Sequence, residues 1–465
     1  MKAYDIAVIG GGPGGYVAAI RAAQAGATVC LVEQERVGGT CLNHGCIPTK
    51  ALYATSVLLQ RFKAAEDHGV TSGAIHFDFA RAMARKDGVV EKLVGGIEQL
   101  LKGNGVDLFH GTATLVEAGR IRLAFSSGVG YLQAHNIILA TGALPVAPPV
   151  LAVDGKNILT SREILAMKER PASLAVVGGG YIGCELAGIL ATFGVKVTVI
   201  EQLPGILGRS DRQLVREVEK GLQGLGVEIL TGTAVEGVTT TATGLDLRLS
   251  GGRRSAAAKV LVAVGRAPNT AGLGLDAVGV ARERGAIVVD AGMRTNVPGI
   301  FAIGDVTNII QLAHVASYQA GVAVTNALGG KAAADYRVVP SCIFTSPEVS
   351  QIGLTEEECK ERGLAVEVGR FAYQASSKAL CEGEPRGSIK LIAARDDDRI
   401  VGATIVGAEA SALIAEVAAA MTAGLTAQRL GAIIHAHPSL PELVMEAAED
   451  VHGRAVHKVG RRKPQ

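Results

Sequence analysis

The chain has 465 residues, enough for about three domains, with 48% hydrophobic residues, 4% aromatic residues and 60 glycines. Its formal net charge of +2 gives no reason to expect a nucleic acid or an anionic membrane as a partner. No apolar run reaches the roughly 18 residues of a transmembrane helix, and seven cysteines, an odd number in a large chain, do not form a disulfide framework, so we expect a cytoplasmic protein.

The N-terminal segment predicts a dinucleotide-binding unit. A short apolar strand over residues 4–9 leads into a glycine loop that fits GxGxxG through Gly10, Gly12 and Gly15. The next strand ends at Glu33, about 20 residues beyond the loop, where a carboxylate can bind the hydroxyls of an adenosine ribose. The helix after the loop would point its N-terminus at the phosphates.

Two cysteines five positions apart, Cys41 and Cys46, follow this unit. In an ideal helix they would be about 7.5 Å apart along the axis, whereas a disulfide needs Cα atoms within roughly 7 Å. A bond between them therefore needs an irregular turn, which Gly45 and Pro48 allow. A thiol pair beside a nucleotide fold indicates electron transfer between a disulfide and a redox cofactor; two small buried apolar side chains are the alternative.

The strand–loop–helix pattern of the N-terminus occurs a second time. An apolar run leads into the loop from Gly178 to Gly183, and the next strand, 195–200, ends at Glu201. Two copies, each with strand, helix and acid, predict two dinucleotide sites. Glu201 would repel a 2′-phosphate and so favours NAD over NADP, with a solvated charge at a strand end as the alternative.

Three further segments complete the predicted layout. Residues 136–142 form a strand that ends in a small-residue turn, and residues 259–269 repeat that arrangement after the second loop. Residues 299–305 form a buried strand that ends in an acid. Residues 336–465 carry no glycine loop of this kind, and their strands and amphipathic helices indicate a separate C-terminal domain.

His437 is the candidate base of this domain. A thiol becomes a good nucleophile when it loses its proton, and a histidine titrates in the right range to take it. Glu442 can accept a hydrogen bond from the other ring nitrogen and fix the tautomer; a surface histidine in a loop is the alternative. His435 has no such partner in the sequence and is expected to be structural. The remaining cysteines lack metal-ligand spacing, so we predict no metal site.

Together these motifs resemble the pyridine nucleotide–disulfide oxidoreductases from end to end, and most closely their lipoamide branch. The resemblance implies an α/β fold with two Rossmann-like dinucleotide-binding domains, for FAD and NAD, plus a C-terminal α+β dimerisation domain. The implied domains are an FAD-binding domain with the redox disulfide at 1–145, an NAD-binding domain at 146–267, a central domain completing the FAD site at 268–336 and an interface domain at 337–465. The motifs that carry the resemblance lie at 38–50, 178–185, 264–269, 302–306, 435–442 and 453–457.

The resemblance also implies the site residues, including a Cys41–Cys46 disulfide and a pairing of Lys50 with Glu185 beside the flavin. The implied catalytic residues are Cys41, Cys46, His437, Glu442, Lys50 and Glu185. The implied FAD-binding residues are Gly10, Gly12, Gly14, Gly15, Glu33, Lys50, Thr141, Gly142, Asp305, Leu312, Ala313 and His314. The implied NAD-binding residues are Gly178, Gly180, Tyr181, Ile182, Gly183, Glu201, Gly265 and Arg266.

The implied activity is the oxidation of protein-bound dihydrolipoamide to lipoamide with NAD+. In a homodimer, His437 of one subunit would deprotonate a substrate thiol that attacks Cys41, and Cys46 would donate to FAD, which passes hydride to NAD. The expected partner is the lipoyl domain of a 2-oxo acid dehydrogenase or glycine cleavage complex. The alternatives are a glutathione-type or mercuric reductase and a non-catalytic nucleotide-binding subunit. His44, between the two cysteines, stands where this family often has an apolar residue.

Overall fold

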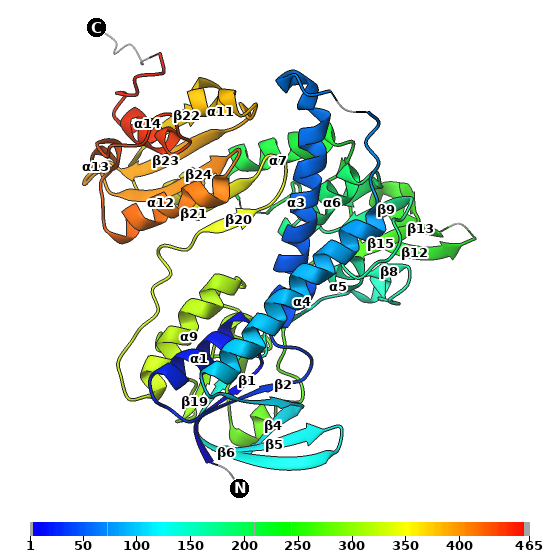
Figure 1. Cartoon of the computed structure of the whole chain (residues 1–465), viewed down its shortest axis with the longest axis vertical. Helices are drawn as coiled ribbons and strands as arrows, with labels where there is room; N and C mark the ends of the chain where they lie inside the picture. Colours follow the sequence, from blue (N-terminus) through cyan, green and yellow to red (C-terminus); the bar gives the residue numbers. More distant parts are fainter. Residues whose placement is uncertain (1–2, 72, 209, 243, 460–465) are drawn as a thin grey trace. The chain divides into compact units, whose positions relative to one another are not determined.

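The structure of the protein, a computed structural model, describes residues 3–71, 73–208, 210–242 and 244–459 (Figure 1). The chain divides into two compact units. The first is made of residues 1–55, 74–170 and 261–335, and the second of residues 56–73, 171–260 and 336–465. Helix α3 (Cys46–Lys63) begins in the first unit and ends in the second, and β15 (Lys259–Val262) likewise spans their boundary in sequence.

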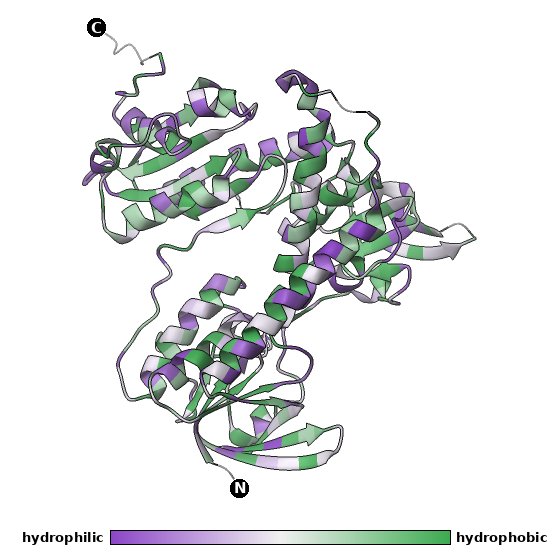
Figure 2. Cartoon of the chain, viewed as in Figure 1, coloured by the Kyte–Doolittle hydropathy of each residue, from purple (hydrophilic) through white to green (hydrophobic). Residues whose placement is uncertain are grey.

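The first unit is built on a parallel sheet in the order β3–β2–β1–β6, with β19 pairing β6 on its other side. All five residues of β2 are buried, and the central strands are coloured as hydrophobic in Figure 2. Both faces of such a sheet are covered, so its strands are continuous apolar runs rather than alternating patterns. The bounds are β1 (Ala3–Ile9), β2 (Val29–Glu33), β3 (Asp107–His110), β6 (Gly128–Leu139) and β19 (Ile300–Ala302).

Helices α1 (Pro13–Gln24) and α9 (Ala313–Ala327) pack against each other in the first unit (Figure 1). Gly14 permits this close approach, because a Cβ there would stand 3.2 Å from Ile303 and 3.3 Å from Ala316. The longer helix α4 (Phe79–Gly103) is capped by Asp78, which accepts from the backbone N–H of Arg81. Together the helices bury one face of the sheet and place two helix N-termini in the unit that holds the first glycine loop.

Smaller elements complete the first unit. Strands β4 and β5 form an antiparallel meander with the start of β6, and β7 pairs antiparallel with β16. The bounds are α2 (Gly39–His44), β4 (Thr112–Glu117), β5 (Arg120–Phe125), β7 (Ala143–Pro145), β8 (Ile158–Leu159), α5 (Ser161–Ile164), β16 (Arg266–Pro268), α8 (Leu275–Val278), β17 (Arg282–Glu283) and β18 (Ala286–Ile287).

The second unit contains the second copy of the strand–loop–helix pattern. Strand β10 pairs parallel with β9 and β11, and α6 follows the glycine loop after β9. An antiparallel sheet of β12, β13 and β14 belongs to the same part of the unit. The bounds are β9 (Ser173–Val177), α6 (Tyr181–Thr192), β10 (Lys196–Ile200), α7 (Arg212–Gly224), β11 (Glu228–Leu230), β12 (Val235–Thr241), β13 (Gly244–Leu249) and β14 (Arg254–Ala257).

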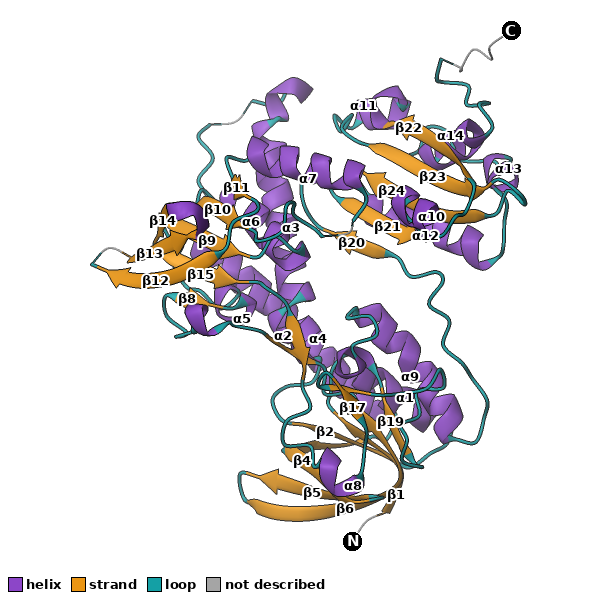
Figure 3. Ribbon diagram, turned by 180° about the vertical axis from the view of Figure 1, so that it is seen from behind, coloured by secondary structure: helices purple, strands orange, loops and turns teal. Residues whose placement is uncertain are grey.

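The rest of the second unit is an antiparallel sheet in the order β20–β21–β24–β23–β22 (Figure 3). Helix α12 packs on β21 and β24, and α14 packs on β22 and β23. The bounds are β20 (Ser341–Ile343), β21 (Val349–Gly353), α10 (Glu356–Glu361), β22 (Val366–Ala372), α11 (Ser377–Cys381), β23 (Ser388–Ala394), β24 (Ile400–Val406), α12 (Ala410–Thr422), α13 (Ala427–Gly431) and α14 (Glu442–Val451).

The predicted fold class, with Rossmann-like α/β sheets and a C-terminal α+β part, is confirmed. The bounds of the four predicted domains stay a prediction. Within the described ranges, no helix combines the length and the apolar character needed to cross a membrane.

A buried ion pair ties β23 to α7 inside the second unit. Lys390 Nζ lies 2.7 Å from Asp211 Oδ2 and 2.7 Å from Glu356 Oε1, and the side chains of Lys390 and Asp211 are 6% and 1% exposed. We expect Lys390→Met to lower the free energy of unfolding by about 3–5 kcal/mol, because it leaves the buried Asp211 carboxylate without its cation. Urea unfolding measures this loss. The matched surface change Lys220→Met breaks an exposed pair with Glu217 and should cost under about 1 kcal/mol; equal losses would contradict the prediction.

Candidate active site

The two glycine loops have the same local geometry although they lie in different units. Gly10 and Gly178 adopt φ angles of 100° and 109°, in the region that favours glycine. The last glycine of each loop packs on the carbonyl of the first: a Cβ on Gly15 would stand 1.7 Å from Gly10 O, and one on Gly183 would stand 2.0 Å from Gly178 O. No residue larger than glycine fits at either position without moving the loop.

The middle glycine of each loop faces open space instead. A Cβ on Gly12 would have no neighbour closer than 3.9 Å, and one on Gly180 would have none within 4 Å. These two residues are the N-caps of α1 and α6, and neither helix has a side-chain cap. The first backbone N–H groups of a helix favour a negatively charged partner. Both loops therefore fit the pyrophosphate of a dinucleotide.

An acidic side chain is anchored beside each loop in the same way. Glu33 Oε2 accepts from Gly11 N at 2.7 Å, and Glu201 Oε2 accepts from Gly179 N at 2.6 Å. The second oxygen of each carboxylate accepts from the backbone N–H two residues further on, at 2.8 and 2.7 Å. Both acids thus lie next to the loop that precedes them in the sequence.

The cysteine segment begins against the first glycine loop. Gly38 N donates to Gly11 O at 2.8 Å, and a Cβ on Gly39 would stand 2.7 Å from Gly12 Cα. Helix α2 ends before Gly45, and α3 begins at Cys46. Cys41 and Cys46 consequently lie on two different helices, separated by the break predicted at Gly45.

Three side chains that the sequence analysis assigned to the site surround Cys41: Cys46, Lys50 and Asp305. A hydrogen bond with Cys46, burial and the charge of Cys46 raise the pKa of the Cys41 thiol, Lys50 lowers it, and Asp305 raises it further. Loss of a proton from both thiols is therefore opposed, and the two cysteines titrate as a pair. A negative charge on the pair is stabilised by the Lys50 ammonium.

The two small-residue turns that the sequence analysis noted are joined in the first unit. Thr141 Oγ1 donates to Asn269 O at 2.7 Å, and Asn269 N donates to Gly142 O at 2.9 Å. The similar turns after β6 and β15 are thus hydrogen-bonded to each other, and the strands that follow them, β7 and β16, form an antiparallel pair.

Arg266, predicted for the second nucleotide, is placed within the first unit. Its Nη2 donates to Ala143 O, and Thr40 Oγ1 lies 3.5 Å away. Burial raises the pKa of Asp305, while the positive charge of Arg266 and a backbone N–H lower it. Arg266 is therefore part of the surroundings of Asp305 and the cysteine segment, and a contact of Arg266 with the second nucleotide stays a prediction.

The N-terminus of α9 also lies beside the first loop. Leu312 is its N-cap, with no side-chain hydrogen bond, and Ala313 and His314 form its first turn. Ser317 Oγ lies 3.3 Å from Pro13 O, at the start of α1. Two uncapped helix N-termini thus face the same region.

In the second unit, Tyr181 and Ile182 open α6 directly after the glycine loop, and the Tyr181 side chain is exposed. Glu185, one turn further on, is buried, and its Oε1 accepts from Phe344 N at 3.0 Å. The pairing of Glu185 with Lys50 stays a prediction.

His437 and Glu442 form a hydrogen-bonded pair at the start of α14. His437 Nδ1 lies 2.8 Å from Glu442 Oε1, and Ser439 N donates to Glu442 Oε2 at 2.8 Å. Burial alone would raise the pKa of Glu442, but the hydrogen bonds from His437 and Ser439 and the charges of His437 and His457 hold it below its usual value. The His437 side chain is 72% exposed, so its other ring nitrogen is open to a substrate.

His435 differs from the expectation that it lacks a partner. Its Nε2 lies 2.7 Å from Glu416 Oε1, and its Nδ1 lies 2.8 Å from Ile433 O. The partner is 19 residues away on α12 and is the charge that interrupts that apolar helix. A lone carboxylate in an apolar helix was the signal that could have revealed it. The ring is nonetheless buried, as a structural side chain would be.

His44 belongs to a charged cluster that the sequence analysis missed. Its Nε2 lies 3.3 Å from Glu35 Oε2, and Arg162 binds both oxygens of Glu35 at 3.0 Å. Burial and the Arg162 charge lower the pKa of His44 in spite of Glu35. His44 is therefore neutral at neutral pH and adds no positive charge between the cysteines.

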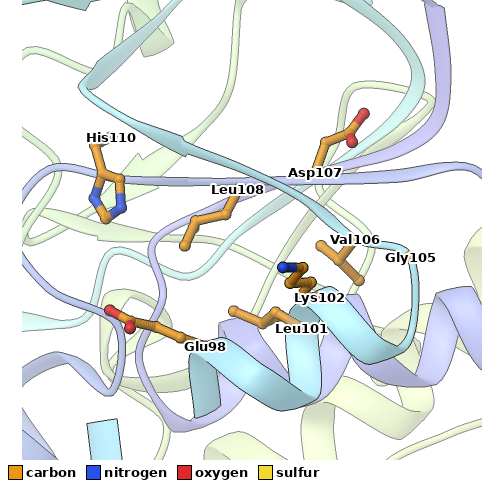
Figure 4. Close-up of a pocket in the computed structure, with 8 residues that line it drawn as sticks. All are labelled: Glu98, Leu101, Lys102, Gly105, Val106, Asp107, Leu108 and His110. Atoms are coloured by element: carbon orange, nitrogen blue, oxygen red, sulfur yellow. The ribbon is translucent and has the colours of Figure 1, made fainter. Parts of the chain in front are cut away.

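A cavity of about 530 Å³ lies elsewhere in the first unit, between the end of α4 and β3 (Figure 4). None of its lining residues is among the predicted site residues. Among the described residues, no group of three His, Cys, Asp or Glu side chains could hold a metal ion. The lining residues are Glu98, Leu101, Lys102, Gly105, Val106, Asp107, Leu108 and His110.

Two family patterns match the chain. Residues 4–320 match the family described as pyridine nucleotide-disulphide oxidoreductase, and residues 339–448 match its dimerisation domain. Proteins named dihydrolipoyl dehydrogenase from Staphylococcus aureus and Halobacterium salinarum are 41% and 42% identical to it. The alignments cover 97% of both chains for the first and 98% of both for the second.

Solved structures with the same fold span the same length. LpdA from Mycobacterium tuberculosis has a TM-score of 0.91 at 28% identity, covering 97% of this chain and 99% of that one. The Cu(II) complex of the HOCl-induced flavoprotein disulfide reductase RclA from Escherichia coli has a TM-score of 0.88 at 32% identity, with the same coverage.

Proposed function

The chain belongs to the pyridine nucleotide-disulphide oxidoreductase family, and from this premise we propose that it oxidises protein-bound dihydrolipoamide to lipoamide with FAD and NAD. The observation that carries the proposal is the Cys41–Cys46 segment seated on the first glycine loop. Since Gly38 and Gly39 contact that loop directly, a cofactor held there lies beside the thiol pair. The protein is thus an oxidoreductase whose electrons pass through two cysteines.

The first loop is the FAD site, and the second is the NAD site. Glu33 would hold the adenosine of FAD, and the N-terminus of α1 would hold its pyrophosphate. The remaining part of the cofactor would lie along Thr141, Gly142, Asp305 and the N-terminus of α9. NAD would be held by the α6 N-terminus, with Tyr181, Ile182 and Glu201. When bound, FAD accepts an electron pair from the dithiol and passes it to NAD+ as hydride.

The cysteine pair takes two electrons from the substrate. His437 removes the proton of one substrate thiol, and the thiolate attacks Cys41 Sγ, which breaks the Cys41–Cys46 bond and releases Cys46 as a thiolate. The second substrate thiol then attacks the sulfur bonded to Cys41, so that the lipoamide ring closes and Cys41 leaves with that proton. Lys50 stabilises the remaining negative charge. Glu442 orients His437 and stabilises its protonated form.

The protein forms a homodimer through the C-terminal part. Several apolar side chains of the C-terminal part are exposed in the single chain, and a partner subunit would cover them. His437 then acts on the cysteine pair of the partner subunit. The lipoyl domain of a 2-oxo acid dehydrogenase or glycine cleavage complex delivers the substrate in the cytoplasm. The exposed apolar side chains are Ile433 (42%), Ile434 (98%), Val456 (80%) and Val459 (95%).

An anaerobic assay tests this function. The purified protein is mixed with dihydrolipoamide and NAD+, and NADH is followed by its absorbance; a parallel reaction contains glutathione disulfide and NADPH. We expect rapid NADH formation in the first reaction only. No turnover of dihydrolipoamide, with oxidation of NADPH by the other disulfide, would contradict the proposal and favour a glutathione-type reductase. FAD binding with no reduction of the disulfide by any thiol would indicate a non-catalytic subunit.

The assignment of NAD to the second loop predicts the effect of Glu201→Gln. A hydrogen bond to a charged group contributes about 1.5–3 kcal/mol, so the change should lower kcat/KM for NAD+ by about 10- to 100-fold. The activity with NADP+ should not fall, since the repulsion of a 2′-phosphate is removed. Steady-state kinetics with both coenzymes measures this, and Glu228→Gln, on neighbouring β11, is the matched control. Equal losses with both coenzymes would contradict the assignment.

A further inference from the structure

The loop that carries His437 joins α13 to α14 over residues 432–441, and its first part is exposed except at one residue. Among residues 432–438, only His435 is not exposed. Within the described part of the chain, the backbones of residues 434–438 form no hydrogen bond with another backbone group. The position of this part of the loop therefore depends on its side chains.

The His435 side chain connects this part of the loop to α12. Its Nε2 lies 2.7 Å from Glu416 Oε1, and its Nδ1 lies 2.8 Å from Ile433 O, so both ring nitrogens have a partner. The side chain is 5% exposed. Because α12 packs on β21 and β24, Glu416 belongs to a packed element of the second unit. His435 thus joins an exposed loop to a fixed helix.

The two contacts of the His435 ring also determine how many protons the pair holds. A carbonyl oxygen only accepts, so Nδ1 carries a proton. A bare ring nitrogen and a carboxylate would repel each other at 2.7 Å, so a second proton lies between Nε2 and Glu416. Whichever of the two side chains binds that proton, the pair has no net charge. A neutral, hydrogen-bonded pair can be buried at little cost.

His437 lies between this anchor and a second one. Two residues span at most about 7 Å of chain, so a fixed His435 restricts the backbone of His437. On the other side, Ser439 N donates to Glu442 Oε2 at 2.8 Å, and Leu440 is buried. The proposed mechanism uses Glu442 but has no part for His435 or Glu416.

We propose that His435 and Glu416 are positioning residues for the active-site base: their hydrogen bond anchors the loop to α12 and so holds the His437 ring where it meets the substrate thiol. This proposal rests on the proposed function, in which His437 takes the substrate proton. Both residues act through His437 and not on the substrate. A reacting group displaced by about 1 Å can lose about 10²-fold in rate, so the position of this ring matters.

Glu416→Leu tests the proposal, because it removes the anchor from another element and leaves the sequence of the loop intact. Glu416 is the one charged residue of the apolar helix α12, where leucine is a good helix former. We expect kcat for dihydrolipoamide oxidation to fall about 10- to 100-fold. Oxidation of NADH by ferricyanide, which takes electrons from the flavin without a substrate thiol, should stay at the parent rate.

Two further variants serve as controls. Glu416→Gln can still donate a hydrogen bond to Nε2 of a neutral His435 ring, so it should keep kcat within about threefold of the parent value. His452→Gln removes a histidine that lies 3.1 Å from Asp398 in the same unit, and it should keep the parent rate. Sedimentation confirms that each variant keeps the parent's oligomeric state.

A double-mutant cycle with His437→Gln separates positioning of the base from a general structural role. If the anchor acts through His437, adding Glu416→Leu to His437→Gln should lower kcat no further. A further loss as large as that of the single variant would overturn the proposal. So would an unchanged kcat in Glu416→Leu, or an equal loss in the ferricyanide reaction.

A second readout needs no turnover. In histidine-labelled protein, the imidazole of His437 should give one set of resonances in the parent and in Glu416→Gln, and broadened or multiple sets in Glu416→Leu, where the ring has several positions. An unchanged single set in Glu416→Leu would contradict the proposal. If the parent protein does not oxidise dihydrolipoamide, the proposed function fails, whereas these resonances still decide whether the His435–Glu416 pair positions His437.

Discussion

Replacement of Cys46 by serine should lower the rate of dihydrolipoamide oxidation by at least about a thousandfold, because covalent catalysis by the disulfide is lost. Serine cannot form the bond to Cys41 that the substrate thiolate breaks. The glycine loop does not depend on the Cys46 side chain, so the purified variant should keep its FAD. NADH formation and the flavin absorbance of the purified protein measure the two effects.

The matched control for this prediction is Cys381→Ser. Cys381 is exposed and lies at the end of α11 in the second unit, away from the glycine loops in the sequence. This variant should turn over dihydrolipoamide at the parent rate. Retained activity in Cys46→Ser would show that electrons reach the flavin by another route, and the disulfide mechanism would then be wrong.

Replacement of His437 by glutamine should lower kcat by about 10²- to 10⁴-fold, the contribution of a general base. Glutamine can still donate a hydrogen bond to Glu442, but it cannot take the proton of the substrate thiol. The loss should be smaller at high pH, where the substrate thiol ionises without help. The pH dependence of kcat with dihydrolipoamide measures the effect. The control is His452→Gln, which removes a histidine that is paired with Asp398 just after α14.

The separation of kcat from KM distinguishes this role from substrate binding. A variant that loses only ground-state binding raises KM and leaves kcat unchanged. If His437→Gln raises KM alone, His437 holds the substrate and another group takes its proton.

Because Glu442 is kept ionised by its hydrogen bonds and neighbouring charges, the parent should lose activity at acid pH once that carboxylate is protonated.

Short-range features of the site could be read from the sequence because they depend on neighbouring residues. The glycine loops are an example: the third glycine touches the carbonyl of the first only five residues away, so spacing alone dictates both residues. The same holds for the helix break at Gly45 and for the His437–Glu442 hydrogen bond, whose partners are five residues apart. Glu33 and Glu201 could be predicted as well, because each lies in the same strand–loop–helix–strand unit as the glycine loop that it contacts.

Pairings between distant charged side chains could not be read in this way. His435 with Glu416, Glu35 with Arg162, and Arg266 beside Asp305 join different elements. A polar side chain at a loop or helix end has many candidate partners of equal chemistry, and the packing of the apolar strands and helices chooses among them. His457 is the clearest case, because its contact with Glu446 follows from the return of the chain along α14.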